Sequence, residues 1–300
     1  MYNYCAVVEY DGTNFKGFQK QRENVRTVQS ELEKAIKILT GNFYDFTYAG
    51  RTDSGVHAKH QVISFKIDKK LDLYKFKWQF NNVLPEDIAI KEIKNVDLNF
   101  NSRKDAVLRE YSYYVVNNNW QSVFLKKYSI MICQNLDIKA MRLAAEKFIG
   151  IKDFKAFSNF NLKNIDLNSI DNTNSIDNTN SVDDNIDDID NEENIDNKDS
   201  KDNIVRNEIG SGAQFSRIYT VRHLYYLKVK KYSGNLIVFK IAANSFLYNM
   251  VRIIVGTLLE IGKGVRSIES IEKAFKTRDR RDAGKIVPAK GLFLTKVLYS

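Results

Sequence analysis

A short polar segment, residues 50–58 (GRTDSGVHA), gathers several side chains that could take part in chemistry. Glycines at positions 50 and 55 flank Asp53, so the backbone of a substrate could come close to its carboxylate. Arg51 and His57 would suit contact with phosphate. A functional loop of this kind would expose one carboxylate beside a guanidinium. A purely structural interpretation stays open, because Asp-Ser-Gly is also typical of an ordinary turn.

A second group of candidates lies in residues 109–113 (REYSY), within a predicted strand. The two-residue period of a strand places Arg109, Tyr111 and Tyr113 on one face. The two tyrosines could simply be core residues. An arginine on the same face, however, needs a partner or an anion, because burying an unpaired charge is costly. A tyrosine beside a catalytic loop could stack on a base or move a proton.

The third candidate is Arg252, which falls on an otherwise apolar predicted helix. It could be an edge residue that extends its charged end into solvent. Alternatively, a largely buried Arg252 neutralises a carboxylate from the other half of the chain, and Asp53 is the attractive partner.

The hydrophobic pattern predicts the elements that position these residues. Strands are predicted at residues 4–10, 62–67, 88–96, 106–117, 221–231, 236–243 and 291–299. Helices are predicted after Thr27 as far as Gly41, at 71–83, from Asp137 to 148, at 246–261 and from Ser267 to 277. This order predicts an α+β fold: two pseudo-duplicated α/β halves around a mainly antiparallel sheet, with a basic cleft between them.

The chain divides into three predicted parts. Residues 1–105 form an N-terminal half with the catalytic loop, and residues 106–158 with 213–300 form a C-terminal half. Between them, residues 159–212 form an insertion rich in Asn and Asp, in which residues 168–173 (NSIDNT) recur at 174–179. So polar a segment cannot bury enough apolar surface to offset the entropy of ordering, which predicts a disordered low-complexity loop.

The net charge of +9 combines two unlike parts. Residues 160–203 carry thirteen acidic residues against three lysines, a local balance of −10, so the rest of the chain carries +19. A body this basic predicts a polyanionic partner, because its summed field attracts phosphates at long range.

Composition also argues against several classes of protein. No run of about eighteen apolar residues exists, so no transmembrane helix is expected. Residues 1–10 lack the pattern of a secretory signal. The two cysteines and three histidines show no metal-ligand spacing. We therefore expect a cytoplasmic protein that binds neither metal nor membrane.

Together these motifs resemble the tRNA pseudouridine synthase A family along almost the whole chain outside the insertion. Residues 50–58 are similar to its signature loop, and residues 10–21 (YDGTNFKGFQKQ) to its first motif, with Phe18 where tryptophan is usual. The similarity continues through residues 81–88 (NNVLPEDI), 100–113, 246–256 and 291–294. Ser54 stands where alanine is common, and residues 101–102 and 286–287 also depart from the family pattern. None of these departures removes a residue with a catalytic role in the family.

The resemblance implies isomerisation of uridine to pseudouridine at positions 38–40, in the anticodon stem-loop of tRNA, without metal or organic cofactor. Asp53 matches the family's catalytic aspartate, here expected to be the nucleophile. Tyr111 matches a tyrosine that stacks on the base and could transfer a proton, and Arg252 matches the arginine that pairs with the aspartate. Arg51 matches an arginine expected to contact phosphate or to help displace the target uridine from its stack.

The expected substrate-binding residues are thus Arg51, His57, Arg109 and Tyr111, and the resemblance implies a homodimer whose two subunits contact one tRNA. Further phosphate contacts, any of which could equally be surface charges, are expected at Lys16, Lys20, Arg22, Arg26, Arg278, Arg280 and Arg281.

Three alternatives stay open. A non-catalytic RNA-binding protein would share the basic body, but it would not need Asp53 together with an arginine on an apolar helix. A nucleoside-cleaving hydrolase would usually need a second acid or a metal. A pseudouridine synthase with a different RNA target is the nearest alternative, because target choice depends on surface shape.

Overall fold

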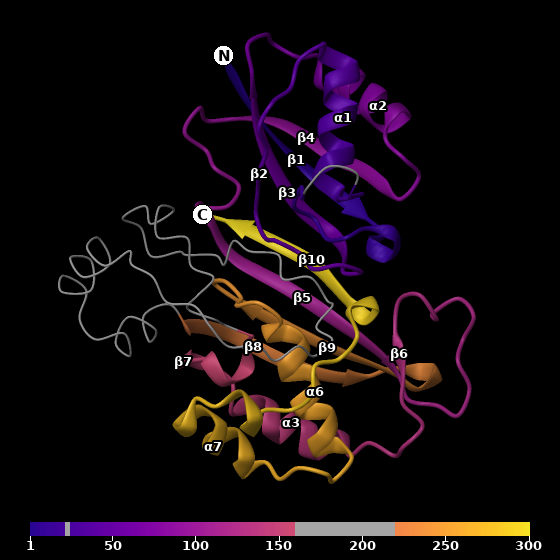
Figure 1. Ribbon diagram of the computed structural model, residues 1–300, viewed down its shortest axis with the longest axis vertical. Coiled ribbons are helices and arrows are strands. Elements are labelled where there is room, and N and C mark those ends of the chain that lie inside the picture. Colours follow the sequence, from indigo (N-terminus) through magenta and orange to yellow (C-terminus); the bar gives the residue numbers. More distant parts are fainter. Residues whose placement is uncertain (22–24, 160–219) are drawn as a thin grey trace, which may run out of the picture.

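One sheet runs through the computed structural model and joins both ends of the chain (Figure 1). The structure describes residues 1–21, 25–159 and 220–300, so the predicted low-complexity loop lies, apart from residue 159, outside the described residues. Along the sheet the strands follow the order β4-β1-β3-β10-β5-β9-β8-β7, with β2 beside β3 and β6 beside β5. The pairs β10–β3 and β5–β6 are parallel, and the other described pairs are antiparallel.

The strands are β1 (Tyr2–Tyr10), β2 (Thr47–Tyr48), β3 (His57–Ile67), β4 (Ile88–Val96), β5 (Ala106–Val116), β6 (Ile130–Met131), β7 (Gly150–Asp153), β8 (Val221–Lys231), β9 (Leu236–Ala243) and β10 (Leu292–Tyr299). The helices are α1 (Val28–Thr40), α2 (Leu73–Val83), α3 (Ile138–Glu146), α6 (Met250–Gly262) and α7 (Glu269–Thr277). Within the described ranges, every helix is too short or too polar to cross a bilayer.

The predicted α+β class with a mixed, mainly antiparallel sheet is confirmed, and most predicted elements are present. Helix α1 begins as expected after Thr27, which forms a reciprocal capping box with Ser30, and it ends at Gly41, whose φ is +82°. The domain limits and the basic cleft stay predictions.

Several predicted boundaries differ from the structure by one to five residues, and three of these differences have clear local reasons. Strand β3 begins five residues early, at His57, because it also pairs with β10 there. Helix α6 begins four residues late, at Met250, because Asn249 adopts a left-handed conformation with φ 60°. Helix α7 begins at Glu269 and its N-cap residue, Ile268, makes no side-chain bond, so Ser267 is not the predicted cap. The short strands β2, β6 and β7 escaped prediction because two to four residues show no periodicity.

The strand register defines two faces of the sheet. One row crosses five strands and is buried throughout; it consists of Ala58, Leu294, Tyr111, Ile241 and Leu227. The next row points to the opposite face; it consists of His57, Phe293, Ser112, Lys240 and Lys228. Neighbouring residues 57 and 58 therefore face opposite sides, and so do residues 111 and 112.

Close backbone packing holds α6 against residues 284–287. A Cβ atom at Gly256 would lie 1.8 Å from the Lys285 carbonyl oxygen, and one at Gly284 would lie 2.5 Å from the backbone of Thr257. The glycines therefore allow α6 to approach this segment more closely than any other residue type would.

We expect Gly256→Ala to destabilise the protein, although alanine is favoured over glycine in a helix by about 1 kcal/mol. The added methyl group meets backbone, which cannot move aside, so the free energy of unfolding in urea should fall by about 1–3 kcal/mol. Gly262→Ala in the same helix is the matched control, because its Cβ would meet the flexible Met141 side chain. Equal or higher stability of Gly256→Ala would contradict the packing argument.

Candidate active site

The loop at residues 49–56 connects β2 to β3 and is held by the end of β1 and the segment that follows it. Phe18 N–H donates to the Thr52 carbonyl oxygen at 3.0 Å, and the Tyr10 hydroxyl bonds to Thr52 Oγ1 at 2.7 Å. Gly55 N–H donates to the Phe15 carbonyl oxygen at 3.3 Å. Backbone hydrogen bonds on both sides of Asp53 thus hold the loop, and the Asp53 side chain remains 21% exposed.

The structure brings Arg252 of α6 to the Asp53 carboxylate. Its Nη1 lies 3.5 Å from Asp53 Oδ2, and the Arg252 side chain is only 17% exposed. Two hydrogen bonds restrain the orientation of the guanidinium: Nε donates to the Val287 carbonyl oxygen at 2.8 Å, and Nη1 donates to Asn249 Oδ1 at 2.9 Å. A positive charge of fixed orientation therefore faces a partly exposed carboxylate.

Tyr111 lies on β5 with its ring buried and its hydroxyl directed toward the loop. Phe246 packs edge-on against the ring, with centroids 5.2 Å apart and planes at 89°. A Cβ atom at Gly50 would lie 3.5 Å from the Tyr111 hydroxyl oxygen, which is ordinary van der Waals contact, so the hydroxyl lies beside residue 50. By contrast, the Tyr113 hydroxyl donates to the Pro288 carbonyl oxygen, and burial raises the pKa of Tyr113, so this tyrosine is structural.

Arg109, on the same face of β5, is surrounded by backbone oxygens. Its guanidinium donates to the carbonyl oxygens of Ala49, Arg103, Ala106 and Asn244, at 2.6 to 3.1 Å. These bonds connect the approach to the Asp53 loop with β5 and with the end of β9. The partner that a buried arginine requires is thus the backbone, and substrate contact by Arg109 stays a prediction.

His57 and Arg51, both expected to contact phosphate, have different positions. Arg51 lies on the loop and is partly exposed. The His57 side chain has no exposed surface and lies on the opposite face of the sheet from Tyr111. The two residues share one motif, and the sequence does not show that the loop ends at residue 56 and that β3 begins at His57.

Most of the cations expected to contact phosphate are engaged within the chain. The ion pairs are Lys20–Glu33, Arg26–Asp87, Arg278–Asp153 and Arg281–Asp279. Arg280 donates to the Gly284 carbonyl oxygen, Lys16 is exposed, and Arg22 lies outside the described residues. Contact of these residues with RNA stays a prediction.

Sequence reasoning assigned no function to Asn249, three residues before Arg252. Its side chain accepts the hydrogen bond from Arg252, and its left-handed backbone conformation starts α6 at the right point. In the described part of the chain, no group of three His, Cys, Asp or Glu side chains could hold a metal ion.

Comparison with known proteins gives a consistent result. A family model described as tRNA pseudouridine synthase matches residues 6–103 and 212–300. The tRNA pseudouridine synthase A of Clostridium kluyveri is 38% identical over 299 residues, which cover 100% of both chains. The proteins of the same name from Acetivibrio thermocellus and Thermoanaerobacter sp. (strain X514) are 34% and 35% identical, again over 100% of both chains. A solved Cbf5-Nop10-Gar1 complex matches at 10% identity, covering 85% of this chain and 54% of that chain, but its TM-score of 0.28 carries no argument.

The buried His57 predicts a dependence of stability on pH. Burial lowers the pKa of His57, and the nearby Asp11 carboxylate only partly opposes this effect. The unfolded chain binds a proton near pH 6.5, so the stability that the neutral ring contributes is complete above that pH and is lost as pH falls below it. We expect the free energy of unfolding in urea to fall less steeply for His57→Gln than for the parent between pH 7.5 and pH 5. The difference between the two slopes should be up to about 1.4 kcal/mol per pH unit.

His60→Gln provides the comparison, because burial also lowers the pKa of His60 and its contribution has the same sign. Each single variant should remove part of the slope, and the double variant should remove both parts. A slope in His57→Gln as steep as in the parent would contradict the prediction.

Proposed function

The chain belongs to the tRNA pseudouridine synthase A family and is a tRNA pseudouridine synthase, an isomerase, and from this premise we propose that Asp53 is its catalytic carboxylate. The reaction breaks the N1–C1′ bond of a uridine and joins C1′ to C5 of the same base. The proton on C5 is lost and N1 ends protonated, so no atom is gained or lost overall.

Asp53 acts as the nucleophile in this proposal. Cleavage of the N1–C1′ bond develops positive charge at the sugar carbon, which an anionic oxygen stabilises, as in glycoside hydrolysis. The observation that carries the assignment is the contact between Asp53 and Arg252 at 3.5 Å, on a loop held by backbone bonds on both sides. Arg252 keeps the carboxylate ionised and oriented before the substrate arrives.

In this proposal Tyr111 contacts the uracil base and Arg51 contacts the RNA backbone. The Tyr111 ring is fixed by Phe246 and its hydroxyl faces Gly50, so it can stack on a uracil displaced from the helix and accept or relay the C5 proton. Arg51 is partly exposed two residues before Asp53, in reach of a phosphate or of the space left by the displaced base.

The target is uridine 38, 39 or 40 in the anticodon stem-loop, and the enzyme works as a cytoplasmic homodimer. Full-length similarity to tRNA pseudouridine synthases A supports this proposal. The excess of 46 Lys and Arg over 37 Asp and Glu supports binding to a folded RNA through its phosphates.

Replacement of Asp53 tests the catalytic assignment. With tRNA labelled by tritium at C5 of uridine, Asp53→Ala should release tritium at least about a thousandfold more slowly than the parent, because the single nucleophile is missing. Binding of tRNA should persist. Asp68→Ala removes an exposed carboxylate next to β3 and should behave as the parent does.

Rapid release by Asp53→Ala would refute the role of Asp53, and no release by the parent on any tRNA would refute the activity. Mapping pseudouridine in the product then tests the target: modification confined to positions outside 38–40 would favour the alternative of a different RNA target.

Arg252→Lys tests the ion pair. Lysine keeps the charge but cannot bond to Val287, Asn249 and Asp53 together, so the rate of tritium release should fall about 10- to 100-fold. If Arg252 acts through Asp53, adding Arg252→Lys to Asp53→Ala should cause no further loss. A full additional loss in the double variant would show that Arg252 works independently of Asp53.

A further inference from the structure

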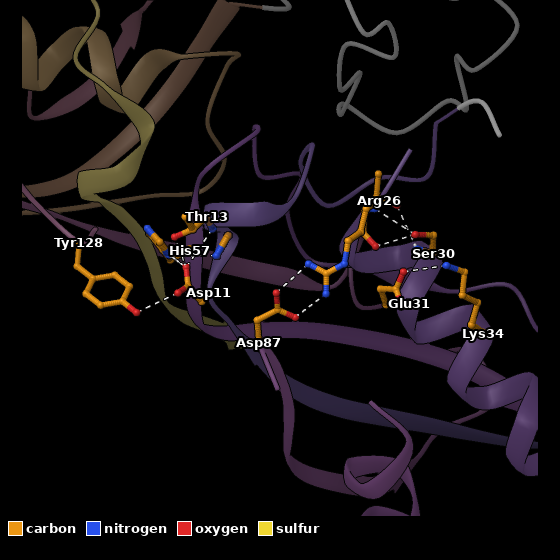
Figure 2. A network of polar contacts seen from close by, with 11 residues as sticks. Asp11, Thr13, Arg26, Ser30, Glu31, Lys34, His57, Asp87 and Tyr128 are labelled. Atoms are coloured by element: carbon orange, nitrogen blue, oxygen red, sulfur yellow. Dashed lines mark hydrogen bonds and ion pairs between the residues drawn. The ribbon is translucent and has the colours of Figure 1, made fainter. Parts of the chain in front are cut away.

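A second connection reaches the Asp53 loop from the opposite face of the sheet. Tyr128, Asp11 and His57 form a chain of polar contacts there (Figure 2). Tyr128 and Asp11 have no part in the proposed site, and contact of His57 with substrate stays a prediction. Tyr128 precedes β6, Asp11 follows β1, and His57 opens β3 four residues after Asp53, so three distant segments meet at one point.

The His57 ring is tightly enclosed. It stacks on Phe293 with centroids 4.5 Å apart, and Tyr128 packs against its edge at 5.3 Å. Gly12 N–H donates to His57 Nδ1 at 3.0 Å, and Asp11 Oδ1 also lies 3.0 Å from that nitrogen. The ring therefore fixes the turn at residues 11–12 relative to the start of β3.

The Asp11 carboxylate joins this turn to the second half of the chain. Its Oδ1 accepts the N–H and the hydroxyl of Thr13, while its Oδ2 accepts the Tyr128 hydroxyl at 2.9 Å. Burial raises the pKa of Asp11, but the bonds from Thr13 and Tyr128 outweigh it and lower the pKa overall. The same bond raises the pKa of Tyr128. A neutral phenol thus donates to a carboxylate, and charge-assisted bonds of this kind are strong.

The turn touches the catalytic loop directly. A Cβ atom at Gly12 would lie 2.0 Å from the Val56 carbonyl oxygen, so the turn and the loop are in backbone contact. Three residues on, the Phe15 carbonyl oxygen accepts both Gly55 N–H and the Ser54 hydroxyl, each at 3.3 Å. A displacement of the turn would therefore displace the residues on the C-terminal side of Asp53.

We propose that Tyr128 is a positioning residue for Asp53, acting through the Asp11 carboxylate and the turn that supports the catalytic loop. Asp53 comes from the first half of the chain, whereas Tyr111 and Arg252 come from the second. Arg252 connects the halves on the substrate face, and Tyr128 connects them on the opposite face. These two contacts restrain the orientation of the loop from opposite faces of the sheet, in addition to the backbone bonds that hold the loop itself.

This inference rests on the proposed role of Asp53, and Tyr128→Phe tests it. The substitution keeps the ring that packs on His57 and removes only the bond to Asp11. We expect kcat for tritium release to fall about 5- to 20-fold, while KM for tRNA stays within about twofold and the melting temperature within a few degrees.

Tyr114→Phe is the matched control. Tyr114 also packs edge-on against Phe293, at 5.2 Å, but its hydroxyl makes no bond to Asp11, so this variant should keep the parent kcat. A parent-like kcat in Tyr128→Phe, an equal loss in Tyr114→Phe, or a raised KM with unchanged kcat would each overturn the proposal.

A double-mutant cycle separates positioning from a general loss of structure. Asp11→Asn should also lower kcat, and adding Tyr128→Phe to it should cost less than about twofold more, because both act through one contact. Losses that multiply would overturn the proposal. The parent and Asp53→Ala are measured in the same assay. An inactive parent or an active Asp53→Ala would refute the proposed function itself, and this outcome is distinct from a failure of the positioning role of Tyr128.

Discussion

The pairing of β10 with both β3 and β5 is the constraint on which the site depends. Strand β10 is the last in the sequence, yet it lies between the strand that follows Asp53 and the strand that carries Tyr111. Its parallel pairing with β3 is short and involves Phe293 with His57 and Leu294 with Ala58. Because strands are spaced by about 4.8 Å, this single insertion sets the separation between the two sides of the site.

The short parallel pair of β10 with β3 would not by itself fix the orientation of one half against the other, so directional contacts surround the junction. Arg109 binds four carbonyl oxygens from separate segments, and Arg252 connects Asp53 with Val287 and Asn249. On the opposite face, Tyr128 binds Asp11. Each contact involves a charged group and is at least partly buried, and electrostatic interactions are stronger in such surroundings than at the fully exposed surface.

The sequence predicted the elements well where side-chain periodicity is strong, as at β8 and β9, whose predicted limits match the structure. It also offered Asp53 as the partner of Arg252, as one of two interpretations of a charge on an apolar helix, and the structure places the two side chains 3.5 Å apart. It could not show that His57, which shares a polar motif with Asp53, is buried on the strand that follows the loop, and contact of His57 with substrate stays a prediction. It gave no hint of Tyr128, because nothing in a loop sequence indicates which distant carboxylate its hydroxyl will reach.

The sequence alone determined the α+β class, the basic character of the body, and which residue types could do chemistry, since these follow from local periodicity, charge and motif. Only the tertiary structure decided which arginine holds a carboxylate and which holds backbone, and that the loop is supported from both faces of the sheet. The physical reason is that such choices depend on strand order and register, which bring together Asp11 and Tyr128, or Asp53 and Arg252, from distant parts of the chain.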